Sequence, residues 1–442
     1  MDSKALLNVE KYATTLRLTK VTKDIGKITQ VTGFTLKGFL PGACVGSVCA
    51  VYPTGSAESF LAEVVGFQDR QVVMMPLGEM RGVGLGSKVE LLRQRATVPV
   101  GTELLGRVID GLGRPIDGKG ELEALEDRQL YGEASNPLFR PPIDQPLSLG
   151  VRAIDGLITV GQGQRVGILA GSGVGKSVLL GMIARNTNAD VNVIALIGER
   201  GREVREFIEQ NLGEEGLKRS VVIVATPDQS PLVRMRGAFV ATTIAEYFCD
   251  QGNNVLLMMD SLTRFGMAQR EIGLSTGEPP ASKGYTPSVF ALLPKLLERA
   301  GRFEGKGSIT GLYTVLVEGD DMDDPIGDSV RSIVDGHIVL DRKLAQKGHF
   351  PAIDVLQSTS RVMRFIISDH HLAMALFIRE NMAVYKEAED LLNIGAYKEG
   401  SNPKIDQAVQ IHDGIEAFLR QGEREASPPG ETLGGMQNLT GG

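Results

Sequence analysis

The chain has 442 residues, enough for about two or three domains, and its 42% hydrophobic and 23% charged content is ordinary for a soluble globular protein. With 47 basic and 54 acidic residues the formal net charge is -7, which argues against a protein whose main task is to coat nucleic acid or an anionic membrane. Three cysteines are too few for a disulfide framework or a four-ligand zinc site, and they favour a reducing, cytosolic compartment.

The N-terminal part of the chain predicts two kinds of structure. In residues 1–20 the apolar positions Leu6, Val9 and Leu16 recur at helical spacing between charged residues, which predicts a short amphipathic helix. This helix either docks a partner or folds back on its own domain. Residues 21–95 contain short apolar runs separated by frequent glycines, a pattern typical of a small β barrel.

The middle of the chain predicts a parallel α/β domain over residues 96–370. Loops rich in glycine and proline occupy residues 111–120 and 136–146 and lead into it. Strand-like apolar runs then alternate with helix-like ones, as in βαβ units with a mostly parallel sheet. The pattern beyond is helical, so we expect a helical C-terminal domain over residues 371–426. Residues 427–442 lack a core-forming pattern and predict a disordered tail.

A glycine-rich loop is the most informative feature of the middle domain. The sequence AGSGVGKS, residues 170–177, follows an apolar strand-like run and leads into a helix-like one. The backbone N–H groups of such a loop, with the positive end of the helix dipole, bind phosphates, while its lysine reaches the β- and γ-phosphates and its serine ligates Mg²⁺. Ala170 replaces the usual first glycine, and a negative φ there makes it acceptable. The alternative is a plain glycine-rich turn. The predicted phosphate-binding residues are Gly171, Ser172, Gly173, Val174, Gly175, Lys176, Ser177 and Val178.

Acidic residues near the ends of two predicted strands are candidates for triphosphate chemistry. Asp260 ends an apolar run, where a carboxylate can hold Mg²⁺ directly or through water. Glu199 follows a neighbouring strand, so we expect it at the same sheet edge, where it could polarise the attacking water. The alternative for Glu199 and Glu203 is a solvated charge cluster that caps the next helix. Arg361 carries no functional signal by spacing alone.

Four segments together give the chain a family resemblance. AGSGVGKS, IGERGRE, LLMMDSLTRFG and PAIDVLQSTSR resemble the nucleotide-binding head shared by rotary ATP synthases and the ATPases of type III protein export. The similarity covers nearly the whole chain, and AGSGVGKSVLLGMIAR and VIALIGERGREVREF most resemble the export ATPases. The resemblance implies a RecA-like P-loop nucleotide domain with a parallel sheet, preceded by a small β barrel and followed by a helical domain. It favours the flagellar export ATPase, with the injectisome ATPase as the alternative.

The resemblance also implies roles for individual residues, with ATP and Mg²⁺ as the bound groups. Glu199 falls on the family's catalytic glutamate, Arg200 on an arginine near the γ-phosphate, and Glu203 on an acid close to the waters of the metal. Arg361 falls on the arginine finger that the adjacent subunit supplies, worth about 10³ to 10⁵ in rate. Phe350 falls where the family places an aromatic ring against adenine.

The resemblance further implies the partners of the chain. Because one chain carries both the glutamate and the finger, identical subunits could build a homohexameric ring. The other implied partners are a stator-like regulator at the N-terminal helix, a central stalk-like export subunit, export substrates with their chaperones, and a membrane export gate. No window approaches the roughly 20 apolar residues that span a bilayer, so we expect a cytoplasmic protein that is peripheral to the inner membrane through these partners. Residues 394–406 lack the acidic loop by which the synthase head holds its rotor, which argues against coupling to a proton-driven rotor.

Two other functions fit parts of the sequence. A non-catalytic subunit of a rotary machine would bind nucleotide without turnover, and Glu199 disfavours it. A ring RNA helicase would use a similar nucleotide domain, but the acidic balance and the 5% aromatic content disfavour it, and we expect no nucleic-acid partner.

Overall fold

The computed structural model describes residues 23–55, 58–123, 125–317 and 324–441. The predicted helix over residues 1–20 lies outside these ranges. The chain divides into two compact units, one that ends at Ala96 and one that begins at Thr97.

The first unit is a closed β barrel with the strand order β1-β2-β5-β4-β3-β6. The first residues of β1 alternate exposed and buried because one face of the strand turns toward the barrel interior, whereas β3 and β5 are buried at nearly every position. Leu36, Cys49, Val64, Met74 and Val89 are among the side chains that fill this interior. This finding confirms the predicted barrel. The strands are β1 Ile25–Thr32, β2 Thr35–Phe39, β3 Val48–Tyr52, β4 Phe60–Gln68, β5 Gln71–Pro76 and β6 Lys88–Arg93.

The second unit is built around a mostly parallel sheet with the strand order β19-β18-β12-β17-β15-β13-β14-β8. Its central strands are mostly apolar because helices cover both faces, and β13 and β14 are buried at every position. Only β19 and the short β16 run antiparallel to their neighbours in this sheet among the described residues. Its strands are β8 Val108–Asp110, β12 Arg165–Ala170, β13 Val191–Ile197, β14 Ser220–Ala225, β15 Asn254–Asp260, β16 Gly301–Arg302, β17 Ser308–Leu316, β18 Gly336–Leu340 and β19 Ile353–Ser360. Small two-stranded sheets pair β7 Thr97–Val100 with β9 Glu126–Gln129, and β10 Pro146–Leu147 with β11 Val160–Gly161.

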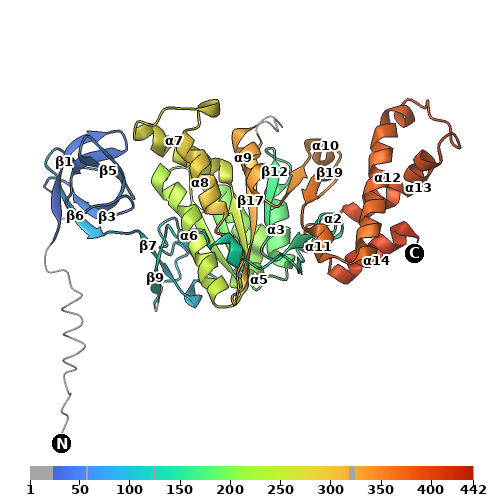
Figure 1. Cartoon of the computed structure of the whole chain (residues 1–442), viewed down its shortest axis with the longest axis horizontal. Helices are drawn as coiled ribbons and strands as arrows, with labels where there is room; N and C mark the ends of the chain where they lie inside the picture. Colours follow the sequence, from blue (N-terminus) through green and yellow to red (C-terminus); the bar gives the residue numbers. More distant parts are fainter. Residues whose placement is uncertain (1–22, 56–57, 124, 318–323, 442) are drawn as a thin grey trace, which may run out of the picture. The chain divides into compact units, whose positions relative to one another are not determined.

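Helices cover the two faces of this sheet (Figure 1). Leu179 and Ile183 of α3 join one hydrophobic core with the strand residues Ile194, Leu256 and Met258. On the other side, α6 packs against β13 and β15, and α9 packs against β12 and β17. The helices of the second unit up to residue 366 are α2 Arg152–Leu157, α3 Lys176–Asn186, α4 Gly201–Glu206, the π-helical turn η3 Phe207–Leu212, α5 Gly213–Lys218, α6 Pro231–Asp250, α7 Leu262–Ser275, α8 Pro287–Leu297, α9 Pro325–Ile333, α10 Arg342–Gln346 and α11 Met363–Ile366.

The C-terminal helices α12 Asp369–Asn393, α13 Pro403–Leu419 and α14 Pro429–Thr440 pack against one another (Figure 1). Ile378 and Ile415 from α12 and α13 belong to the same hydrophobic core as the sheet. Among the described residues, no helix combines the length and the apolar character that crossing a bilayer requires.

The prediction of a disordered tail over residues 427–442 was wrong, because the chain from Pro429 to Thr440 forms α14. Met436 on this helix is fully buried, and a Cβ atom at Gly435 would lie 2.9 Å from the ring of Phe418. Glycines destabilise an isolated helix, and they interrupt the apolar spacing by which a helix is predicted from sequence. For these two reasons the sequence did not indicate α14. Here Gly435 lets α14 approach α13 closely, so tertiary packing outweighs the low propensity.

Candidate active site

The glycine-rich loop connects the end of β12 to the start of α3. Ala170 is the last residue of β12 and is 1% exposed, so the position that usually holds glycine is here part of an extended strand, as a negative φ requires. Gly173 and Gly175 have φ values of 77° and 90°, in the left-handed region that side chains other than glycine rarely adopt. These glycines allow the tight turn from β12 into α3, which begins at Lys176. The N-terminus of this helix offers a binding site for phosphate.

Lys176 and two carboxylates meet beside this loop. The Lys176 ammonium forms an ion pair with Oδ1 of Asp260 at the end of β15, and its Nζ lies 3.6 Å from Oε1 of Glu199. The hydroxyl of Thr314, on the intervening strand β17, donates a hydrogen bond of 2.7 Å to Oδ1 of Asp260. Sequence reasoning missed Thr314, although a hydroxyl residue near the end of a strand-like run is a signal that could have been followed. These side chains gather because parallel strands end at the same sheet edge.

Glu199 lies in an environment that favours its protonated form. Burial, the negative charge of Asp260 and a hydrogen bond with Glu203 raise the pKa of Glu199 to about 7, against the opposing effect of Lys176. Its side chain is 16% exposed, so the carboxyl group is partly shielded from water. A carboxylate with a pKa near neutrality beside a phosphate loop is suited to accept a hydrogen bond or a proton from water.

Arg200 and Glu203 lie at the exposed side of this cluster. Arg200 precedes α4, and its side chain is 79% exposed; the Glu203 side chain is 49% exposed, and the two charged groups are 3.5 Å apart. The structure thus brings Glu203 next to Glu199, whereas the Arg200 guanidinium extends into solvent.

Phe350 lies between α10 and β19 but next to the glycine loop. A Cβ atom at Gly175 would lie 3.6 Å from the ring atoms Cδ1 and Cε1 of Phe350. The ring is 46% exposed, although Pro351 after it is buried. An exposed aromatic face beside a phosphate loop is suited to stack on a nucleotide base.

Arg361 and Lys176 lie at opposite ends of the sheet's strands, Lys176 after the carboxyl end of β12 and Arg361 near the amino end of that strand. The backbone N–H of Arg361 donates to the carbonyl of Asp335 at 2.9 Å, and the N–H of Asp335 donates to the carbonyl of Arg165 at 2.8 Å. Because Arg165 begins β12 and the glycine loop follows its end, the length of a strand separates Arg361 from the loop. The exposed Arg361 guanidinium donates to the carbonyl of Arg331 at 3.4 Å, so a second molecule can reach it.

The residues near the loop offer few but suitable ligands for magnesium. Within the described part of the chain, no group of three or more His, Cys, Asp or Glu residues is arranged to hold a metal ion. Mg²⁺ bound with nucleotides needs no such cage, because phosphates and water fill most of its coordination sphere and one or two protein oxygens complete it. The buried Asp260 carboxylate and the exposed Ser177 at the start of α3 provide oxygens of this type.

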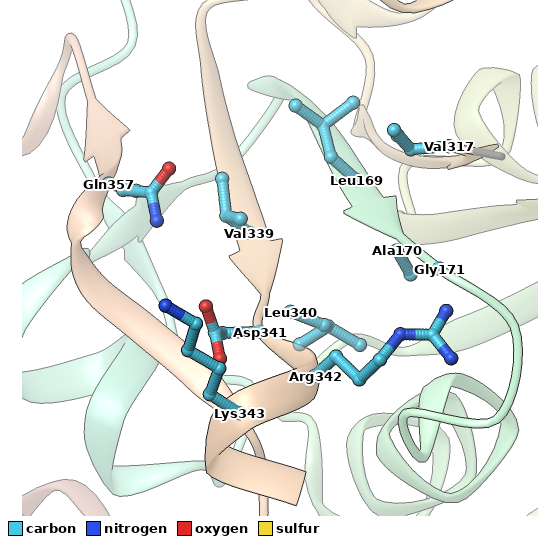
Figure 2. Close-up of a pocket in the computed structure, with 10 residues that line it drawn as sticks. All are labelled: Leu169, Ala170, Gly171, Val317, Val339, Leu340, Asp341, Arg342, Lys343 and Gln357. Carbon is cyan, nitrogen blue, oxygen red and sulfur yellow. The ribbon is translucent and has the colours of Figure 1, made fainter. Parts of the chain in front are cut away.

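A cavity of about 180 Å³ lies beside the beginning of the loop. It is bounded by the ends of β12 and β18 and by the start of α10, and Figure 2 shows Arg342 extending from α10 to the side where Gly171 lies. None of the acidic residues of the cluster around Lys176 lines it. It is thus separate from the place where the ammonium and the two carboxylates meet.

A parallel sheet that presents a glycine loop, a lysine and two carboxylates at one edge defines a P-loop nucleotide phosphohydrolase. The comparisons with known proteins give the family. Residues 150–360 match the nucleotide-binding domain of the ATP synthase alpha/beta family, residues 28–93 match its beta-barrel domain, and residues 367–438 match the C-terminal domain of the T3SS EscN ATPase. The chain belongs to the ATP synthase alpha/beta family, in the branch of the flagellar and type III secretion ATPases, and it is an ATPase.

Curated relatives of nearly the same length carry both names of this branch. The flagellum-specific ATP synthase of Bacillus subtilis (strain 168) is 53% identical over 427 residues, 96% of this chain and 97% of that protein. The protein of the same name from Treponema pallidum (strain Nichols) is 51% identical and covers 98% of this chain and 96% of its own length. The type 3 secretion system ATPase of Sinorhizobium fredii is also 51% identical, over 94% of this chain and 92% of its own.

Solved structures confirm the fold class. The assembled ATPase EscN from the type III secretion system of enteropathogenic E. coli has a TM-score of 0.88 and is 48% identical, and the match covers 94% of this chain and 99% of that one. EscN in complex with its central stalk EscO matches with a TM-score of 0.87, 47% identity and the same coverage of both chains. Barrel, nucleotide domain and helical region thus occur in the predicted order.

Proposed function

We propose that this chain hydrolyses Mg-ATP to energise protein export through a flagellar type III apparatus. The observation that supports the proposal best is the meeting of Lys176, Asp260 and Glu199 at one sheet edge beside the glycine loop, with Lys176 Nζ 3.6 Å from Glu199 Oε1. Phosphoryl transfer needs a phosphate cradle, positive charge on the transferred group and a residue that orients water, and these side chains fill those roles.

In this mechanism each residue acts at a stated atom. The loop N–H groups and the Lys176 ammonium hold the phosphates, and Phe350 stacks on the base. When bound, Mg²⁺ would neutralise the developing negative charge, held by Ser177 and Asp260 with Glu203 close to its waters. Glu199 accepts a hydrogen bond from the attacking water and orients it toward the terminal phosphate.

A second copy of the chain completes the site. Arg361 lies at the far edge of its own sheet and is exposed, so we infer that it enters the site of an adjacent subunit and stabilises the charge of the transition state. Arg200 takes a place near the γ-phosphate from the exposed side of the site. Identical subunits arranged in this way form a homohexamer, and the assembled state of the similar EscN supports this arrangement.

The test of these roles compares charge-neutral variants. Glu199→Gln is expected to lower turnover by about 10² to 10⁴ while nucleotide binding stays within a few-fold, because the carboxylate acts on water. Glu209→Gln is the matched control, since Glu209 lies in η3 and pairs with Arg205 at the surface. Normal turnover of Glu199→Gln would contradict its role.

Mixing two inactive variants tests the shared site. Glu199→Gln and Arg361→Ala subunits each lack one half of the site, but a mixed ring contains interfaces that join an intact Glu199 to an intact Arg361. Random equal mixing restores about one quarter of the sites. A mixture that stays as inactive as its parents refutes the contribution of Arg361 from a neighbour.

The remaining partners follow from the family. We propose that residues 1–20 dock a stator-like regulator, that a central stalk-like subunit enters the ring, and that substrates, their chaperones and a membrane export gate bind the assembly on the cytoplasmic side of the inner membrane. The complex of EscN with its stalk EscO supports the stalk partner. Deletion of residues 1–20 is expected to abolish binding of the regulator, and unchanged affinity would contradict this role.

The injectisome remains the second candidate because an injectisome-type ATPase and a flagellar one are both 51% identical to this chain. The genes beside this one decide between them. Neighbouring flagellar basal-body genes support the flagellar apparatus, and injectisome genes in their place contradict it.

A further inference from the structure

The segment that carries Phe350 is fastened to the C-terminal helix α13 through its preceding residue. His349 is 2% exposed, and its Nδ1 lies 2.9 Å from Oε2 of Glu416 on α13. The hydrogen bond with His349 holds the pKa of Glu416 below its usual range, which keeps this carboxylate charged. The N–H of His349 also donates to the carbonyl of Leu344 at 3.0 Å, so its backbone is fixed to the end of α10.

A second hydrogen bond holds the backbone of Phe350 itself. The N–H of Gln421, just beyond α13, donates to the carbonyl of Phe350 at 3.0 Å. The Gln421 side chain is in turn held at the start of α2, because its Nε2 donates to the carbonyl of Gly150 at 2.8 Å and its Oε1 accepts from the N–H of Arg152 at 2.9 Å. The backbone of Phe350 is therefore tied to a residue that is itself immobilised in the core.

The space beside these contacts is open rather than tightly packed. A cavity of about 480 Å³ lies between the segment after α10, β19 and the helices α12 and α13, and His349 and Glu416 are both part of its wall. Tyr385 of α12 and His412 of α13 also line this cavity and stack with ring centroids 3.5 Å apart. Because a cavity borders His349, the contact with Glu416 contributes more to its position than it would in a close-packed core.

We propose that Glu416 and Gln421 are positioning residues for nucleotide base recognition, which hold the Phe350 ring beside Gly175 from the C-terminal helical region. This inference rests on the proposed stacking of Phe350 on the base. It gives α13 a function at the active site, because the base stacks well only while α13 keeps the Phe350 segment in place. The phosphate loop itself is untouched by these contacts.

The test separates base recognition from phosphate recognition. Glu416→Ala in the full-length assembled protein is expected to raise KM for ATP about three- to tenfold, a part of what one base stack is worth, with kcat changed less than about twofold. Inorganic tripolyphosphate has no base, so its inhibition constant against ATP hydrolysis should stay constant. Glu416→Gln keeps an oxygen that accepts from His349 and should restore most of the ATP affinity.

Two further variants show whether a raised KM of Glu416→Ala is specific to the contact with the Phe350 segment. Glu380→Ala is the matched control, because Glu380 forms an exposed ion pair with Lys404 between α12 and α13 at 3.2 Å and should leave both constants unchanged. In a Phe350→Ala background, Glu416→Ala should add nothing, since the group that it positions is gone.

The outcomes distinguish this inference from the proposed function. An unchanged KM for ATP in Phe350→Ala refutes the stacking of Phe350 on the base. A raised KM for Phe350→Ala with a normal KM for Glu416→Ala overturns only the positioning role. Equal weakening of ATP and tripolyphosphate by Glu416→Ala overturns it as well, because the defect then includes the phosphate loop.

Discussion

Replacing Glu199 with glutamine should stabilise the nucleotide-free protein in a pH-dependent way. The pKa of this carboxyl rises from 4.5 to about 7 on folding, mainly through burial and then through the charge of Asp260. Between these values the folded state binds a proton that the unfolded state has lost, so the stability of the natural protein falls as pH rises through this window. At 1.36 kcal/mol per pH unit the full effect is about 3 kcal/mol.

Glutamine has nearly the shape of glutamate and no charge, so it removes this cost. The stability gain of Glu199→Gln is therefore expected to be small at pH 5 and to approach about 3 kcal/mol at pH 8. Calorimetry of both proteins without nucleotide at the two pH values measures this gain. The melting temperature of the second unit should rise by a few degrees at pH 8 and by much less at pH 5.

Glu209→Gln controls for the loss of a negative charge, because the Glu209 side chain is 56% exposed at the surface. Its melting temperature should follow that of the natural protein at both pH values. A gain for Glu199→Gln that is the same at pH 5 and pH 8, or no gain at all, would refute the idea that a buried, reluctantly ionised carboxylate lies beside the phosphate loop.

Other substitutions test single contacts. Thr314→Val removes the 2.7 Å hydrogen bond to Asp260 with little change of shape. It should lower kcat/KM for ATP about three- to tenfold and raise the Mg²⁺ concentration needed for half-maximal activity. A Mg²⁺ titration checks this, and an unchanged titration speaks against a metal role. Glu203→Gln removes the charge of Glu203 and weakens its hydrogen bond to Glu199, both of which raise the pKa of Glu199. The acid limb of the pH profile of kcat/KM should therefore move to lower pH by a fraction of a unit, and a move to higher pH would contradict this reasoning. Met436→Ala empties a fully buried site and should cost about 2 to 5 kcal/mol in denaturant unfolding of the second unit, whereas no cost would mean that α14 is not packed there.

The fold and one half of the site follow from local sequence signals. The glycines of residues 171–175 mark the turn between β12 and α3, and five apolar residues precede Asp260 in β15, so periodicity and turn chemistry suffice to place Lys176 and Asp260 at one edge. Glu199 follows by the same rule about parallel strands.

The other half of the site, which contains Arg361 and Phe350, depends on strand pairing and tertiary contacts that no local sequence pattern indicates. β19 runs antiparallel to β18, and this direction puts Arg361 at the edge away from the loop. Phe350 reaches Gly175 although 174 positions separate them in the sequence, and only tertiary packing brings them together. For the same reason α14 was missed, since tertiary packing such as that of Gly435 against Phe418, rather than intrinsic preference, stabilises this glycine-containing helix.

The placement of Glu199 and Arg361 at opposite edges of one sheet limits how copies of the chain can cooperate. If each Arg361 serves a neighbour, the surface around Arg361 on one copy must meet the surface around the phosphate loop on the next, so the two contacting surfaces differ. A twofold dimer uses the same patch on both copies, so it could provide this contact only if one patch contained both Arg361 and the loop, which lie at opposite ends of the strands. A pair joined head to tail completes one site and leaves the second without a finger, whereas a closed ring completes every site. Turnover per subunit should therefore increase steeply with assembly into rings, and a dimer with the full specific activity of the ring would contradict the shared site.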